Sequence, residues 1–141
     1  MKVLSASDVA HLVTEVGVQP FLARLVERMA RDFRNWEQFH LSPRHATRVT
    51  DGIIELMPCA NGSLYSFKFV NGHPGNVKRG IPSIIAFGVV AEVATGRPLM
   101  LAEMALLTAL RTAATAALGA RYLARPDSAA MGIIGTGAQA E

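Results

Sequence analysis

The 141-residue sequence has few of the features that would place it outside an ordinary cytoplasmic domain. It has one cysteine, Cys59, which cannot form a disulfide within the chain and suits a reducing compartment. Charged residues make up only 18%, the net charge is +3, and no run of Lys or Arg is present, which argues against nucleic-acid binding. No apolar run reaches the roughly 18 residues of a membrane span, and the N-terminus lacks a secretory signal. We therefore expect a cytoplasmic protein without a nucleic-acid or membrane partner.

The composition itself is that of a packed domain. Half of the residues are apolar, which excludes a disordered tail or a collagen-like repeat, and the length suits about one domain. No internal repeat is visible. The four histidines, at positions 11, 40, 45 and 73, lack metal-ligand spacing, so no metal site is predicted.

Two amphipathic helices are predicted in the N-terminal part of the chain. Ser7 and Asp8 are good capping residues, and apolar residues follow at helical spacing over about 7–16, until Gly17. Pro20 suits the first turn of a second helix, which an apolar stripe extends to about Trp36.

The rhythm then changes to that of strands. Residues 52–57 and 64–70 alternate between two faces, with a hairpin-type turn at Asn61-Gly62 between them. Residues 84–93 are nearly continuously apolar, which indicates a strand covered on both faces, and a turn leads back into 99–101. We therefore predict an α+β fold, with two N-terminal helices and a mainly antiparallel or mixed sheet.

A long helix over 104–124 is apolar on almost every side, which predicts burial in the core or in a partner. Arg111 lies in its middle. A buried guanidinium needs an anion, so Arg111 either forms an ion pair, with Glu103 or Glu92, or binds a carboxylate or phosphate. The residue pattern alone favours the ion pair.

The C-terminal end has a glycine-rich pattern. Residues 129–134 are predicted to form a short buried strand, leading into Gly135-Thr136-Gly137-Ala138-Gln139-Ala140. A strand followed by Gly-x-Gly-x-x-Ala is the start of a dinucleotide-binding fingerprint, in which backbone N–H groups approach a pyrophosphate. The alternative is an ordinary terminal turn. The helix and the acidic residue that would decide between them fall beyond position 141.

Three further charged residues each have an ordinary structural interpretation. Lys68 lies in an aromatic strand, either as a solvated side chain or as a ligand contact. Glu55 on the neighbouring strand either is solvated, pairs with Lys68, or binds a ligand. Arg44 would ordinarily lie on the surface, and the segment 71–76 has the composition of a plain loop.

Taken together, several segments resemble the ornithine cyclodeaminase/mu-crystallin family. The segments that carry the resemblance are 54–58 (IELMP), 67–74 (FKFVNGHP), 86–89 (AFGV), 110–115 (LRTAAT) and 133–139 (IIGTGAQ). Their order and spacing fit, the resemblance covers essentially the whole chain, and the 67–74 segment is most similar to bacterial ornithine cyclodeaminases. Family members have a substrate-binding and dimerisation domain followed by a Rossmann domain that binds NAD(P).

The resemblance implies roles for particular residues. It assigns the substrate α-carboxylate to Arg44, Lys68 and Arg111, and the distal amine of L-ornithine to Glu55. The residues that it places at the NAD cofactor are Ser83, Arg111, Gly135, Gly137, Ala138 and Gln139. No catalytic residue is implied within this chain, because the general acid/base aspartate of the family falls past position 141.

The resemblance also implies a reaction and a domain division. The reaction is the redox-neutral conversion of L-ornithine to L-proline and ammonia with bound NAD. Residues 1–128, with the connecting helix 104–124, would form the substrate-binding and dimerisation domain. Residues 129–141 would begin a truncated Rossmann domain, so we expect the chain to be inactive by itself. The dimerisation domain of the family implies a homodimer. As a monomer the chain should be poorly soluble, because the first strand of the truncated domain would leave an apolar edge unpaired. The alternatives are a non-enzymatic dimerisation or small-molecule-binding module, and an NAD(P)-dependent imine reductase or amino-acid dehydrogenase.

Overall fold

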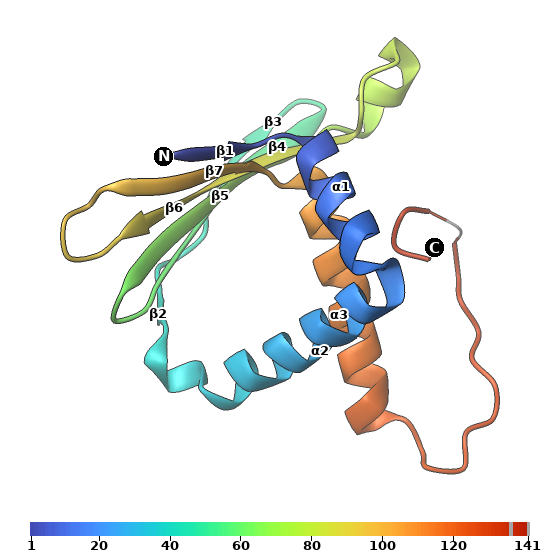
Figure 1. Cartoon of the computed structure of the whole chain (residues 1–141). Helices are drawn as coiled ribbons and strands as arrows, with labels where there is room; N and C mark the ends of the chain where they lie inside the picture. Colours follow the sequence, from blue (N-terminus) through green and yellow to red (C-terminus); the bar gives the residue numbers. More distant parts are fainter. Residues whose placement is uncertain (136, 141) are drawn as a thin grey trace.

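The computed structural model describes residues 1–135 and 137–140, and it has an α+β fold (Figure 1). Its α-helices are α1 (Ala6–Val16), α2 (Val18–Arg34) and α3 (Ala105–Leu123). The strands are β1 (Lys2–Leu4), β2 (His40–Leu41), β3 (His45–Val49), β4 (Gly52–Ala60), β5 (Leu64–Gly72), β6 (Ile84–Glu92) and β7 (Pro98–Glu103), with short 3-10 helices η1 (Trp36–Gln38) and η2 (Pro74–Arg79).

The seven strands form one mixed sheet in the order β1-β7-β6-β5-β4-β2, with β3 also paired to β4. All pairs are antiparallel except β1 with β7. The four predicted strands are therefore confirmed: β4, β5 and β7 are longer than the sequence indicated, and β6 ends one residue earlier, at Glu92. Strands β1, β2 and β3 were not predicted, because they are short and lack an alternating apolar pattern.

The two predicted N-terminal helices are also confirmed. Helix α1 begins one residue earlier than expected, because its N-cap is Ser5: the Ser5 hydroxyl accepts from the Asp8 N–H, and the Asp8 carboxylate accepts from the Ser5 N–H. Helix α2 buries Val26 and Ala30 against Ala114 and Leu118 of α3, and this contact is the main apolar cluster of the helices.

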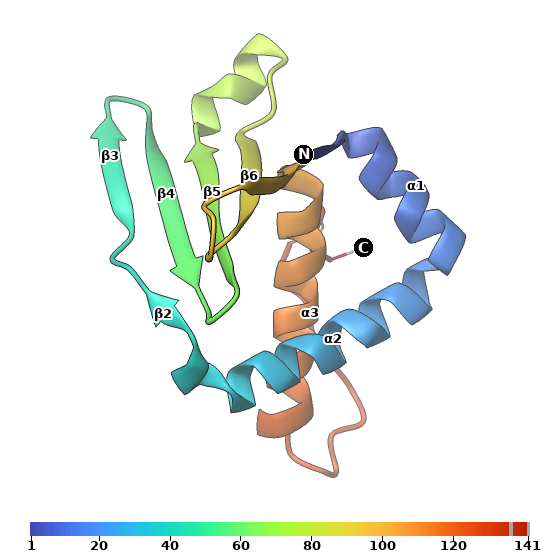
Figure 2. The same cartoon turned by 60° about the vertical axis from the view of Figure 1, so that its left-hand side comes forward.

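All three α-helices lie on one side of the sheet, and within the described part of the chain no helix covers the other side (Figures 1 and 2). On the helix side, Ala86 and Ala102 are 4% and 1% exposed. On the opposite side, Ile85 and Phe87 of the same strand β6 are 43% and 41% exposed. The prediction that both faces of this strand are covered is therefore wrong for the isolated chain: continuous apolar sequence here supplies one covered face and one open apolar face.

Helix α3 is less buried than its composition suggested. Of its residues only Ala114 and Leu118 are buried, and Tyr122 and Leu123 near its end are largely exposed. Arg111 is exposed as well, so the prediction of a buried guanidinium is wrong for this chain. The helix packs along one stripe against α2 and the sheet, and its other sides face outward.

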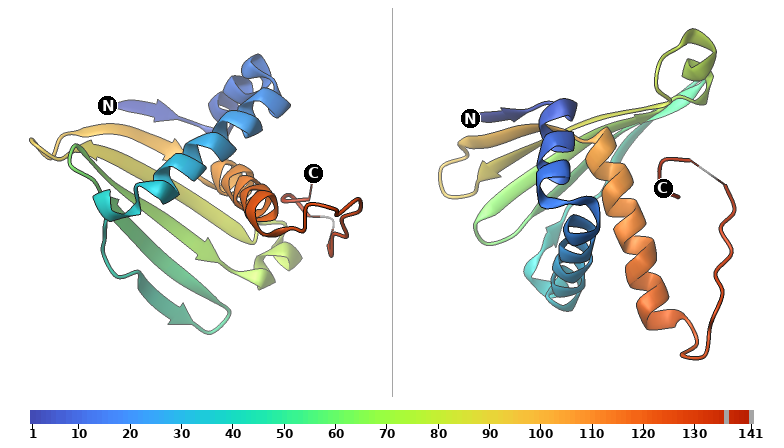
Figure 3. Two further views of the ribbon diagram at one scale, coloured as in Figure 1. Left: turned by 90° about the horizontal axis from the view of Figure 1, so that it is seen from below. Right: turned by 45° about the vertical axis from the view of Figure 1, so that its right-hand side comes forward.

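The predicted strand over 129–134 is not formed. Figure 3 shows that the chain after α3 runs beside that helix and does not join the sheet. A strand needs a neighbouring strand for its backbone hydrogen bonds, and no strand of the sheet lies alongside this segment. Met131, Ile133 and Ile134 are consequently exposed.

Candidate functional site

The fold brings Arg44, Glu55, Lys68 and Arg111 to one region of the sheet. Arg44 directly precedes β3, Glu55 lies on β4, and Lys68 lies on β5 opposite Met57. Because Glu55 and Met57 are two residues apart on β4, Glu55 and Lys68 project from the same face. Arg111 comes from α3, the helix that runs across that face. We call these four residues the cationic cluster.

Arg44 and Glu55 form an ion pair within the cluster. One guanidinium nitrogen, Nη1, donates to Glu55 Oε1 at 3.2 Å. The Glu55 side chain is only 17% exposed, whereas that of Arg44 is 55% exposed. The pair therefore joins a carboxylate held on the sheet to an arginine that reaches it from the edge. The suggested pairing of Glu55 with Lys68 is replaced by this contact.

Lys68 lies in an environment that disfavours its positive charge. Its side chain is partly buried, and its Nζ donates to Thr108 Oγ1 of α3 at 3.4 Å. Burial lowers the pKa of the Lys68 ammonium, and the positive charges of Arg111 and Arg44 lower this pKa further, while the negative charge of Glu55 acts in the opposite direction. All three other members of the cluster are thus near enough to act on Lys68.

Arg111 adds a charge that no described residue neutralises through an ion pair. Among the residues that the structure describes, its guanidinium has no ion-pair partner. The predicted partners are engaged elsewhere: Glu103 accepts hydrogen bonds from the first N–H groups of α3, and Glu92 lies 3.9 Å from Arg97. The predicted structural ion pair of Arg111 is therefore wrong.

The charge balance of the cationic cluster suits a small anion. Three cationic groups and one carboxylate give a sum of +2, with two guanidinium groups whose planar donors match a carboxylate. Glu55 supplies an acceptor for an ammonium group on the same ligand. The cluster can therefore recognise a molecule that carries both a carboxylate and an amine.

A groove of about 920 Å³ lies beside α3, and no residue of the cationic cluster lines it. Helix α3 lines one wall, with Thr108 and Thr112 among the contributing residues, and Ser83 lies at its edge just before β6. The glycine-rich segment forms the other wall through Gly135, Gly137, Ala138 and Gln139. Of the residues predicted at a cofactor, only Arg111 is not part of the lining, and Thr136 of the motif lies outside the described residues.

The glycine-rich segment has one property of a phosphate-binding turn. Gly135 has φ +98°, a conformation that favours glycine. A dinucleotide loop also needs a preceding strand and a following helix, whose N-terminus receives the pyrophosphate. Over the described residues 125–135 and 137–140 neither element is present. These residues therefore do not form a cofactor site by themselves.

The loop predicted at 71–76 is an ordered junction. Asn71 Oδ1 accepts from the N–H of Ile85 at 2.6 Å, and Asn71 Nδ2 lies 3.1 Å from His73 Nδ1. A side chain at Gly52 would meet the carbonyl oxygen of Gly72 at 2.4 Å, so only glycine fits there. This part of the 67–74 segment holds β4, β5 and β6 in register and lies next to Lys68 in the sequence.

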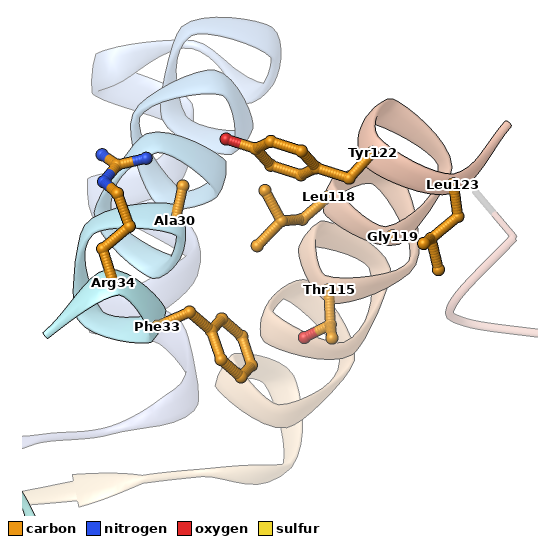
Figure 4. Close-up of a pocket in the computed structure, with 8 residues that line it drawn as sticks. All are labelled: Ala30, Phe33, Arg34, Thr115, Leu118, Gly119, Tyr122 and Leu123. Atoms are coloured by element: carbon orange, nitrogen blue, oxygen red, sulfur yellow. The ribbon is translucent and has the colours of Figure 1, made fainter. Parts of the chain in front are cut away.

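A second hollow, of about 490 Å³, separates the ends of α2 and α3 (Figure 4). Phe33 and Ala30 of α2 face Leu118 and Tyr122 of α3 across it, and the lining is almost entirely apolar. It shares no residue with the cationic cluster.

Elsewhere in the described residues, no group of His, Cys, Asp or Glu is arranged to hold a metal, and no helix has the length and apolar character that crossing a bilayer requires.

Thr108 is the residue that sequence analysis missed. It contacts Lys68 and also lines the groove. Its signal was present, because Thr108 is a polar residue of a largely apolar helix and lies three and four positions before Arg111 and Thr112. The register of α3 against β5 is needed to show that Thr108 faces Lys68.

Comparisons with known proteins agree on one family. The model of the ornithine cyclodeaminase/mu-crystallin family matches residues 6–141. The ornithine cyclodeaminase of Agrobacterium tumefaciens (strain Ach5) is 52% identical over 138 residues, which is 98% of this chain and 39% of that protein. The chain thus spans about 39% of the length of this curated relative.

Solved structures show the same fold. A lysine cyclodeaminase, described for its recognition of L-lysine, L-ornithine and L-2,4-diaminobutyric acid, is 38% identical, with a TM-score of 0.89 over 99% of this chain and 43% of its own. An archaeal alanine dehydrogenase, described as a dimer with bound NAD, is 28% identical, with a TM-score of 0.84 over 99% of this chain and 42% of its own.

Proposed function

Because the chain belongs to the ornithine cyclodeaminase/mu-crystallin family, we propose that it is the substrate-binding part of an ornithine cyclodeaminase. In this proposal the cationic cluster binds L-ornithine, with the α-carboxylate held by Arg44, Lys68 and Arg111 and the distal ammonium held by Glu55. The observation that carries the proposal is the meeting of these four side chains on one face of the sheet, where Arg111 has no ion-pair partner among the described residues.

The charges of L-ornithine complement those of the cluster. Its carboxylate would supply the anion that Arg111 lacks among the described residues and would relieve the repulsion that Lys68 experiences from the two arginines. Its distal ammonium would share Glu55 with Arg44. Each end of the ligand would thus meet an opposite charge, and the α-carbon would be fixed between them, which is an orientation effect.

The proposed reaction converts L-ornithine to L-proline and ammonia. The hydride that leaves and returns to the α-carbon in this redox-neutral conversion is chemistry that NAD supplies when bound. We propose that residues 129–141 begin the NAD-binding domain of the complete protein, while residues 1–128 hold the substrate. Ser83, Gly135, Gly137, Ala138, Gln139 and Arg111 are the proposed residues nearest the cofactor.

We expect the 141-residue chain to be inactive by itself. It spans about 39% of its Agrobacterium relative, and the family resemblance assigns the general acid/base aspartate to a later segment. Within the chain, the described glycine-rich residues also lack the strand and helix of a dinucleotide loop. The chain can therefore bind and orient the substrate without completing the reaction.

We also propose that a second copy of the chain covers the open face of the sheet. That face presents Leu56, Ile85 and Phe87, each about 40% exposed, and the stacked pair Phe69–Phe87. An apolar sheet face of this kind is a typical association surface. The archaeal alanine dehydrogenase described as a dimer has the same fold over 99% of this chain, which favours a copy of the chain as the occupant.

A chimeric enzyme tests the proposed function directly. This chain replaces the 138 matched residues of the Agrobacterium tumefaciens enzyme, and ammonia, proline and NADH are measured after addition of L-ornithine and NAD. We expect proline and ammonia in equal amounts without net NADH change. The K68M variant of the chimera is the matched control, and its kcat/KM should fall about 10- to 150-fold, the loss of a hydrogen bond to a charged group.

Other results of this experiment would overturn the assignment. A folded chimera that oxidises an amino acid or reduces an imine with net turnover of NAD(P)H would indicate a dehydrogenase or imine reductase. The chimera could also fold without any turnover while the 141-residue chain still dimerises and binds a ligand. That result would indicate a non-enzymatic module.

A further inference from the structure

Thr108 occupies a position that connects two parts of the molecule. Its hydroxyl oxygen accepts a hydrogen bond from Lys68 Nζ at 3.4 Å, and its side chain also lines the groove that contains the glycine-rich segment. None of the four residues of the cationic cluster lines that groove. Thr108 thus contacts the cationic cluster on one side and lines the groove on the other.

We propose that Thr108 is a positioning residue that holds the Lys68 ammonium at the border between the cationic cluster and the groove. This inference rests on the proposed function, because the Lys68 ammonium is the group that would place the substrate carboxylate next to the cofactor side of the molecule. Thr108 would act through Lys68, and its own contact with the substrate is not required.

The chemistry of the hydroxyl suits this role. The Lys68 ammonium is partly buried beside two arginines, so it needs an acceptor that does not cancel the positive charge of the cluster. A carboxylate at position 108 would bind the ammonium, cancel its charge and so reduce the positive charge of the cluster. A neutral hydroxyl accepts one hydrogen bond and leaves the charge available for the ligand.

The hydroxyl also keeps its own hydrogen to donate. Among the described residues, no acceptor for Thr108 Oγ1 is present, and its one hydrogen bond is the one it receives from Lys68. A hydroxyl that accepts from an ammonium becomes a better donor. An anion that approaches Lys68 from the groove side would therefore meet two donors, the ammonium and the threonine hydroxyl.

The titration of Lys68 tests the inference in the chain as it exists. The sequence has only three lysines, at positions 2, 68 and 78, so the Cε resonance of Lys68 can be assigned and followed with pH after carbon-13 labelling of lysine. A hydrogen bond donated by the ammonium favours its charged form. We therefore expect T108V to move the Lys68 titration to lower pH and T108S to restore it.

Thr112 supplies the matched control. It lies one turn further along α3 and lines the same groove, and it has no contact with Lys68 among the described hydrogen bonds. T112V should leave the Lys68 titration unchanged. A T108V titration equal to that of wild type, or an equal shift in T108V and T112V, would overturn the inference. If T108V does not fold, T108A serves in its place, because alanine also removes the acceptor.

A second readout separates this inference from the proposed function. In the chimeric enzyme, T108V should lower kcat/KM for L-ornithine about tenfold, the size of one hydrogen bond, and T108S should recover most of the loss. A chimera that is active and insensitive to T108V contradicts the role of Thr108 and leaves the proposed function standing. A Lys68 titration that depends on Thr108, in a chain whose chimera is inactive, supports the contact and contradicts the proposed function.

Discussion

Replacing Lys68 by methionine is expected to stabilise the chain and to weaken its binding of L-ornithine. In the free protein, burial and the charges of Arg111 and Arg44 disfavour the Lys68 ammonium. Methionine keeps an unbranched apolar side chain and removes the charge. The free energy of unfolding should rise by about 0.5–1 kcal/mol. This is the lower part of the range for single stabilising substitutions, because the Lys68 ammonium is only partly buried. For a chain of this length the melting temperature should rise by about 2–5 °C.

Binding should change in the opposite direction. A hydrogen bond from an ammonium to a carboxylate contributes about 1.5–3 kcal/mol, so K68M should raise the dissociation constant of L-ornithine about 10- to 150-fold. Calorimetric unfolding and calorimetric titration measure the two quantities, with K68R as the control that retains the charge. The reasoning is refuted if K68M melts below both wild type and K68R, or if K68M binds L-ornithine as tightly as wild type.

The same residue predicts a pH dependence of stability. The pKa of Lys68 in the folded protein lies below its usual value of 10.5, so between these two values the unfolded chain binds more protons than the folded one. The contribution of Lys68 to the free energy of unfolding therefore becomes more favourable as the pH rises through this alkaline range. Urea unfolding at several pH values should show that the advantage of K68M over wild type shrinks as the pH approaches 10.5.

Three other variants test the fold and its assembly. F87D places a charge on the open sheet face and should convert dimers to monomers in sedimentation experiments, whereas L12D, at a similarly exposed apolar position on α1, should not; dimers that persist in F87D would argue against this face. G52A should lower the free energy of unfolding by about 1–3 kcal/mol, because its methyl group would meet the backbone of the neighbouring strand, and G62A, which faces open space, serves as the neutral control in urea unfolding. S5A should cost about 1 kcal/mol of stability through loss of the α1 cap, and thermal unfolding of S5A equal to wild type would contradict the observed capping box.

The fold could be predicted from the sequence where one element carries its own periodic pattern. Helix α2 has an apolar stripe on a charged background, and β5 alternates regularly, so both were found. Strand β3 has exposed residues along its whole length and owes its pairing to β4, which no local pattern reveals. Residues 129–134 show the converse case, because an apolar run cannot form a strand without a neighbour to pair with.

The candidate site was predictable in part for a similar reason. Lys68 and Arg111 stand out in the sequence as charges within apolar elements, so they were identifiable as candidates. Arg44 and Glu55 look like surface residues, and only the family resemblance singled them out before the structure placed them 3.2 Å apart. Thr108 could not be assigned, because its contact with Lys68 spans 40 positions and depends on how α3 lies across the sheet.

The most direct test of the central claim is a titration of the carbon-13-labelled chain with L-ornithine and with putrescine, observed at the Lys68 Cε resonance. Putrescine has two amines and no carboxylate, so it separates carboxylate recognition from attraction of an ammonium to Glu55. If the cationic cluster binds an amino-acid carboxylate, L-ornithine should move the pKa of Lys68 upward and putrescine should not. No response to L-ornithine, or an equal response to both compounds, would contradict the account.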